Sequence, residues 1–192
     1  MENNQKTHQA IKRGLFWAPI YLFLFIPFII LPFIASWYPN NLIIKILLFI
    51  VYWGNLIIGI LLYLGIRALG KERNDKKLVT HIHSLIVLSA AVVALLAGMS
   101  LLGIVLIPVQ LILMVGLPLL LGFGIVFLLL AKDFKRLESD FGVPATKAAV
   151  WHKISGWLSI SIILSPLGGL FSLIADYYMW RVLQQAAKRN LE

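Results

Sequence analysis

The sequence predicts an all-α fold, a polytopic bundle of helices integral to a membrane. Hydrophobic residues make up 60% of the 192 residues and charged residues only 13%, whereas a soluble domain holds about half and about a quarter, respectively. Residues 78–131 contain no Lys, Arg, Asp or Glu. Because one membrane crossing takes about 20 apolar residues as a helix, this stretch is long enough for two crossings. The length fits a single membrane domain over residues 1–192.

The net charge of +9 comes from short basic clusters between the apolar stretches. This distribution favours contact with anionic lipid headgroups and argues against a nucleic-acid surface. The first cluster contains Arg67, Lys71, Arg73, Lys76 and Lys77. The second contains Lys132, Lys135, Arg136, Lys147 and Lys153. The chain has no cysteine, which excludes disulfides, thiolate metal ligands and a cysteine nucleophile.

The first span is predicted at residues 15–36, after a polar segment at residues 1–13. The apolar run is longer than the roughly 7–15 residues of a signal peptide, so we expect this span to be retained. Three prolines are expected to bend the helix: Pro19, Pro27 and Pro32.

The second span is predicted at residues 42–66, after a turn with the composition Tyr-Pro-Asn-Asn. Asn55 lies near its middle. A side-chain amide at that depth either bonds a neighbouring helix or contacts a ligand or ion, and the sequence leaves both readings open.

Two further spans are predicted at residues 79–103 and 109–131, joined by a turn near Pro108. Small residues every four positions allow two membrane helices to approach closely. The third span carries such a stripe: Ala90, Ala94 and Gly98. We therefore expect this face to pack against another helix.

Residues 132–153 are predicted to form a cytoplasmic amphipathic loop. Three apolar residues recur at helical spacing within it: Phe134, Leu137 and Phe141. Part of the loop is therefore expected to lie along the membrane surface.

The last apolar stretch has two readings. It is long enough for a single span at residues 154–175, but Pro166 and the Gly168-Gly169 pair form a strong break in its centre. The alternative is a broken helical hairpin over residues 148–187. Ser155 and Ser159 are expected to serve helix packing in either case.

The loops after the second and fourth predicted spans hold the two basic clusters, and the intervening turns hold no Lys or Arg. This asymmetry predicts a multi-pass protein of the cell (inner) membrane with its N-terminus in the cytoplasm. A hairpin would keep the C-terminal basic residues on the cytoplasmic side as well, and the charge distribution favours it.

No catalytic motif is visible, and the sequence predicts neither a metal nor a cofactor. Residues singled out as ligand or partner contacts are Asn55, His83, His152, Asp176 and Arg181. His81 and His83 are two positions apart, so they point in different directions on a helix. Both, like His152, are expected at the cytoplasmic interface. In the hairpin reading, Asp176 lies at membrane depth and needs a partner, for which Arg181, Arg67 and another subunit are candidates.

Three functions remain open from the sequence. The first is a non-enzymatic subunit or scaffold of a larger membrane complex, which would contact protein partners in the membrane. The second is a small transporter or channel, because broken helices often build substrate sites. The third is a membrane enzyme that acts on a lipid or quinone at the cytoplasmic face through His83, His152 or Asp176.

Overall fold

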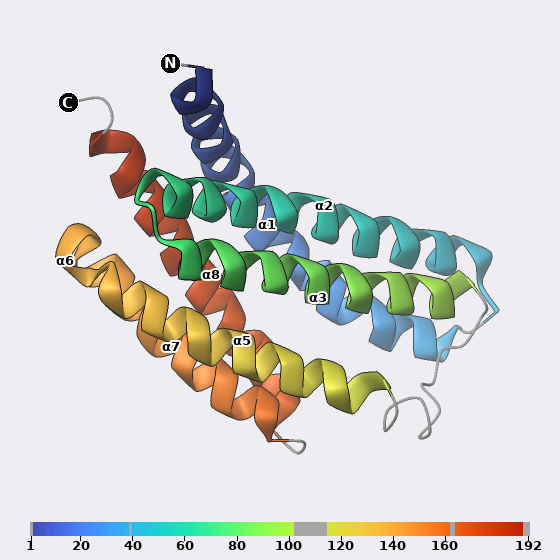
Figure 1. The fold of residues 1–192 in the computed structure, drawn as a ribbon. Helices are drawn as coiled ribbons and strands as arrows, with labels where there is room; N and C mark the ends of the chain where they lie inside the picture. The colour runs from blue at the N-terminus through green and yellow to red at the C-terminus, as the bar shows by residue number, and fades with distance from the viewer. Residues whose placement is uncertain (1, 39, 102–114, 162–163, 190–192) are drawn as a thin grey trace.

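The computed structural model describes residues 2–38, 40–101, 115–161 and 164–189 (Figure 1). The chain is 94% helical and has no strand among these residues, which confirms the all-helical prediction. The helices are α1 (Glu2–Trp37), α2 (Leu42–Glu72), α3 (Lys76–Leu101), α5 (Leu117–Arg136), α6 (Glu138–Phe141), α7 (Val143–Ile160) and α8 (Ser165–Arg189).

In the described part of the chain, four helices are long and apolar enough to cross a membrane, as the sequence predicted. The segments that meet this criterion are Thr7–Pro27, Leu42–Glu72, Lys76–Leu95 and Leu117–Arg136. Helix α1 begins well before the predicted start at residue 15 and runs on through its three prolines. The turn expected near Pro108 lies outside the described residues.

The helices form two groups that meet along one side (Figure 1). Helix α2 packs between α1 and α3, and α7 packs between α5 and α8. Contacts of α3 with α5 and of α1 with α8 join the two groups. Both termini, the α2–α3 turn and α6 lie at the same end of the bundle (Figure 1).

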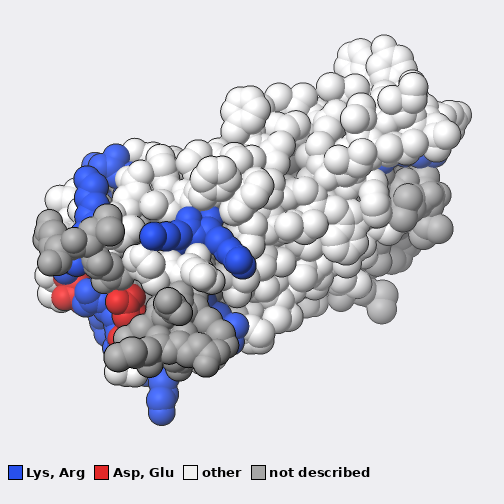
Figure 2. Space-filling model, turned by 90° about the horizontal axis from the view of Figure 1, so that it is seen from above, with Lys and Arg blue, Asp and Glu red and all other residues white. Residues whose placement is uncertain are grey.

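Charged side chains gather at this end, while most of the remaining surface in view is uncharged (Figure 2). Large apolar side chains are exposed along α1 and α2, among them Phe23, Phe33 and Ile57. Water solvates such a surface poorly, and large contiguous apolar patches are rare on soluble monomers. The distribution therefore suits lipid around the middle of the bundle and water at its charged end.

The apolar stripe of residues 132–153 faces the protein. Phe134, Leu137 and Phe141 are buried in the main core. The reason is a chain reversal after the single turn of α6. Gly142 adopts φ +53°, a backbone conformation that glycine adopts without steric cost, and α7 then runs back along α5. The apolar stripe faces the bundle because the chain folds over it.

The C-terminal stretch forms two helices packed against each other, α7 and α8. Helix α7 ends at Ile160 and α8 begins at Ser165, so the break precedes the proline-glycine run. Pro166 falls in the first turn of α8, where a proline costs no helical hydrogen bond. The structure therefore has two packed helices in this stretch, and how they lie relative to a membrane stays a prediction.

Candidate functional site

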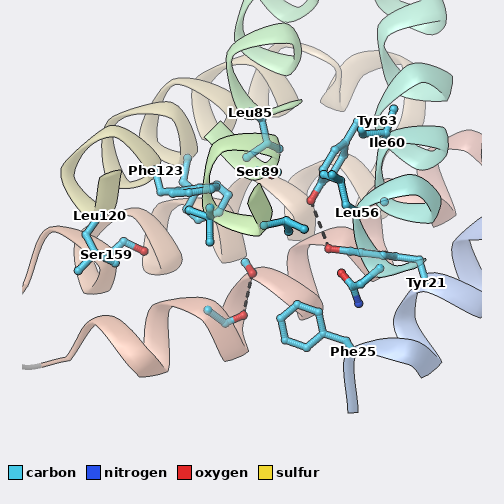
Figure 3. Close-up of a pocket in the computed structure, with 17 residues that line it drawn as sticks. Tyr21, Phe25, Leu56, Ile60, Tyr63, Leu85, Ser89, Leu120, Phe123 and Ser159 are labelled. Carbon is cyan, nitrogen blue, oxygen red and sulfur yellow. Dashed lines mark hydrogen bonds between the residues drawn. The ribbon is translucent and has the colours of Figure 1, made fainter. Parts of the chain in front are cut away.

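A cavity of about 230 Å³ lies inside the bundle and is lined by residues of α1, α2, α3, α5, α7 and α8. Most of its wall is apolar, and the residues that line it include no charged side chain. Its polar groups come from Tyr21, Asn55, Tyr63, Ser89, Ser159 and Ser172. Figure 3 shows Tyr21 and Phe25 of α1 on one side of the cavity and Phe123 of α5 on another. Ligand sites in proteins typically combine such apolar walls with a few polar groups.

Asn55 lies on the wall of this cavity and is only 6% exposed. Its amide nitrogen Nδ2 has no hydrogen-bond partner. A buried polar group without a partner costs about 1–3 kcal/mol, so the amide is available to a ligand. The helix-contact reading of Asn55 has no hydrogen bond to support it among the described residues.

Asp176 of α8 is bonded by two tyrosines from other helices. Tyr21 Oη donates to Asp176 Oδ2 at 3.1 Å, and Tyr63 Oη lies 3.5 Å from the same oxygen. The two hydroxyl oxygens are 3.3 Å apart (Figure 3). Asp176 is 2% exposed, and its other oxygen, Oδ1, has no partner.

The cationic partners considered for Asp176 do not pair with it. Arg181 is exposed and donates to Tyr177 Oη at 3.3 Å, and Arg67 makes no ion pair in the described part of the chain. Tyr21 and Tyr63 were not predicted from the sequence as partners of Asp176. The three residues lie far apart in the chain, and nothing in their spacing links them.

The serine-rich hairpin closes one side of the cavity. Ser155 Oγ donates to the carbonyl oxygen of Gly168 at 3.0 Å, and Ser172 Oγ donates to that of Gly169 at 2.7 Å. Ser159 is buried against Gly168, where an added Cβ would lie 2.6 Å from its Oγ. The two predicted packing serines thus lie between α7 and α8.

The predicted packing stripe on α3 has a different environment. Ala90 packs against a small core cluster formed by residues of α1, α2 and α3. Ala94 is exposed, and a Cβ at Gly98 would meet nothing within 4 Å among the described residues. The described helices therefore leave the middle residue of the stripe exposed, and Ala90 and Gly98 are half-buried.

The histidines do not form one site. His152, expected at the interface, is fully buried between the rings of Phe127 and Phe134, with ring centroids 5.6 and 5.4 Å away. Both of its ring nitrogens lack a partner. His83 is exposed, and no contact joins it to His152 or Asp176 in the described ranges. The residues named for the enzyme hypothesis are thus separate.

A second polar cluster ties the charged end together. His81 Nδ1 lies 2.6 Å from Asp133 Oδ2, and Arg136 bonds both Asp133 Oδ1 and Asp75 Oδ2 at 2.9 Å. Arg73 pairs with Asp140 beside it. These contacts fasten the α2–α3 turn to the end of α5. One signal for them is visible in the sequence, the spacing of three residues between Asp133 and Arg136.

Asp75 carries two roles in this cluster. Its Oδ1 accepts the backbone N–H of Leu78 at 3.0 Å, which caps the start of α3. Burial raises the pKa of Asp75, but the Leu78 N–H and the Arg136 guanidinium outweigh burial, so its pKa lies below the ordinary 3.8. The folded state therefore favours the ionised form of the Asp75 side chain over the protonated form.

Three or more His, Cys, Asp or Glu side chains do not gather as a metal site anywhere in the described residues. No protein-family model, curated protein or solved structure matches this chain. Its function must therefore be argued from the cavity and the groups around it.

Proposed function

We propose that this protein is a small membrane transporter that holds its substrate in the central cavity. The observation that carries the proposal is the set of polar groups around it: the unpartnered Asn55 amide and the tyrosine pair bonded to Asp176. Polar and ionisable groups at membrane depth are costly, and where they occur they usually serve a ligand or ion pathway.

The broken C-terminal hairpin supports the same proposal. Ser159 near the end of α7 and Ser172 near the start of α8 both line the cavity. In transporters, discontinuous helices commonly form the substrate site, because their ends offer backbone groups that a continuous helix keeps bonded. Here the break places two helix ends beside one cavity.

The proposed orientation puts the charged end of the bundle in the cytoplasm of a cell whose inner membrane holds the protein. Both termini and the basic turn between α2 and α3 lie at that end (Figure 1). An excess of Lys and Arg on the cytoplasmic side is the general rule for membrane proteins. The same basic residues would contact anionic headgroups.

The hypothesis of a non-enzymatic subunit stays a prediction without a specific observation in its favour. The exposed apolar side chains of α1 and α2 suit lipid chains as well as a partner helix. Purification in a mild detergent tests it, and a lone monomer would count against it.

The transport proposal is tested by the accessibility of single cysteines. The chain has no cysteine of its own, so each variant carries one reactive thiol. Ser89→Cys places the thiol on the cavity wall. Val87→Cys, on the same helix, places it on the outer surface, where Val87 is 53% exposed. Only a hydrated thiol ionises and reacts with a methanethiosulfonate.

We expect the impermeant reagent trimethylammonium-ethyl methanethiosulfonate to modify Ser89→Cys when it is added to either side of sealed proteoliposomes. The Val87→Cys control should react from neither side. Modification of Ser89→Cys from one side only, or at the rate of the control, would rule out transport through this cavity.

A further inference from the structure

The carboxylate of Asp176 has no counter-charge in the described structure. Its contacts are the hydroxyls of Tyr21 and Tyr63, both on Oδ2, and Oδ1 has none. A buried charge is normally paired, because the cost of removing it from water is several kcal/mol. Two neutral donors satisfy part of the hydrogen-bonding capacity of this carboxyl group, and they would leave its ionised form without a counter-charge.

Tyr21 and Tyr63 line the cavity and connect it to Asp176 by hydrogen bonds. Each phenol has one proton. Tyr21 donates its own to Asp176, and Tyr63 shares its own between Asp176 and Tyr21. The phenol oxygens therefore meet a bound molecule as acceptors, with the carboxylate behind them. A positively charged group is the best match for such a pair.

The cavity wall is also rich in aromatic rings. Five of the lining residues are aromatic: Tyr21, Phe25, Tyr63, Phe123 and Phe127. The face of an aromatic ring attracts a cation, and organic ammonium groups are the ligands that aromatic sites commonly recognise. An inorganic divalent ion prefers carboxylate oxygens among its ligands, and no carboxylate is among the residues that line the cavity.

A negatively charged ligand is disfavoured. No Lys or Arg is among the residues that line the cavity, so an anion would meet the Asp176 carboxylate without compensation. A neutral hydrocarbon would fill the cavity but leave the carboxylate without a counter-charge.

We infer that the cavity binds a lipophilic organic cation, an ammonium ion whose other groups are apolar. Asp176 is its counter-charge and acts through the hydroxyl groups of Tyr21 and Tyr63. This inference rests on the proposed function and specifies its substrate class. Asn55 then contacts the uncharged part of the molecule, since its amide offers either an oxygen or an N–H after a flip.

The test compares two probes of nearly the same shape on the full chain in detergent. Phenyltrimethylammonium carries a quaternary nitrogen, and tert-butylbenzene has carbon in its place. Binding of radiolabelled phenyltrimethylammonium is measured by equilibrium dialysis, with tert-butylbenzene as a competitor. We expect the neutral compound to compete at least about tenfold more weakly than unlabelled phenyltrimethylammonium, because it lacks the charge.

Two matched pairs of variants locate the binding. Asp176→Asn should weaken phenyltrimethylammonium binding at least about tenfold, while Asp140→Asn removes the same charge at the exposed end and should leave binding unchanged. Ser89→Phe should abolish binding by filling the cavity, and Val87→Phe, which adds the same ring outside, should not. Should Asp176→Asn fail to fold, Tyr63→Phe takes its place, with an expected loss of several-fold.

Equal competition by the neutral probe, or full binding in Asp176→Asn, would overturn the inference. If Ser89→Cys is still reached from both sides, the transport proposal survives and only the substrate class is wrong. If Ser89→Cys is not reached but the cation binds, the substrate class is supported and transport fails.

Discussion

The ring of Tyr21 lies directly against Gly59, where an added Cβ would come within 2.9 Å of Tyr21 Cε2. The same tyrosine donates its hydroxyl proton to Asp176 at 3.1 Å. Because Gly59 of α2 has no side chain, the Tyr21 ring of α1 can reach the Asp176 carboxylate of α8. Three helices are fixed relative to one another at the wall of the cavity.

Gly59→Ala should therefore destabilise the protein and disturb the cavity. The new methyl group has to displace the Tyr21 ring, and overpacking of this kind costs about 1–3 kcal/mol. The measurement is the thermal unfolding midpoint in detergent. Gly54→Ala is the control on the same helix, because its Cβ would meet nothing within 4 Å. That variant should gain up to about 1 kcal/mol from helix propensity, and equal effects at both positions would refute the argument.

Another pair of glycines, adjacent in the chain, tests the packing of α7 against α8. A Cβ at Gly168 would lie 2.6 Å from Ser159 Oγ and 2.9 Å from the backbone nitrogen of Ser159. Since backbone cannot rotate away, Gly168→Ala should push α8 from α7 and cost about 1–3 kcal/mol or more. Gly169→Ala, with nothing within 4 Å, should be neutral or stabilising. An unfolding midpoint that falls equally in both variants would show that the two helices do not pack as described.

Asp75 should make stability depend on acid pH. Because its folded-state pKa lies below 3.8, its ion pair with Arg136 contributes fully above the unfolded value and is lost as pH falls through the folded value. Asp75→Asn keeps the cap on Leu78, since asparagine also caps helices. It should cost about 0.2–1 kcal/mol at pH 7 and less at pH 2. Unfolding curves at both values check this, and an equal loss at pH 2 would contradict it.

His152 should be replaceable by an apolar residue of similar size. Its two ring nitrogens are buried without partners, and such groups cost about 1–3 kcal/mol each when left unsatisfied. His152→Leu is therefore expected to raise the unfolding midpoint, although it gives up the stacking on Phe127 and Phe134. His83→Leu, at an exposed position, is the control and should change it little. A lower midpoint in His152→Leu would mean that the imidazole makes a bond essential to the fold.

Much of the helical architecture was predictable because it depends on local properties. Long apolar stretches identified four helices long enough to cross a membrane. The proline-glycine run indicated an interruption of the last apolar stretch, but the run itself lies in α8 and the interruption lies just before it. The helix ends were less predictable. Helix α1 extends far into the polar N-terminal segment, because a helix can continue into water after its apolar part has ended.

The candidate site was predictable only in part. Asn55 and Asp176 stood out because polar side chains are rare in apolar stretches. Tyr21 and Tyr63 did not, since tyrosine is ordinary in such helices. Phe134, Leu137 and Phe141 gave the right helical spacing and the wrong environment, because an apolar stripe faces either lipid or protein and the spacing is the same for both.

The amino-acid sequence by itself determined that this chain is helical, where its apolar stretches lie and at which end its positive charge gathers. These properties follow from hydropathy and backbone preference within a few turns of helix. The tertiary structure alone decided that Tyr21, Tyr63 and Asp176 meet beside a cavity, and that His152 is enclosed by two phenylalanine rings. Those contacts join residues on different helices, and only the way the helices pack fixes which of their side chains face one another.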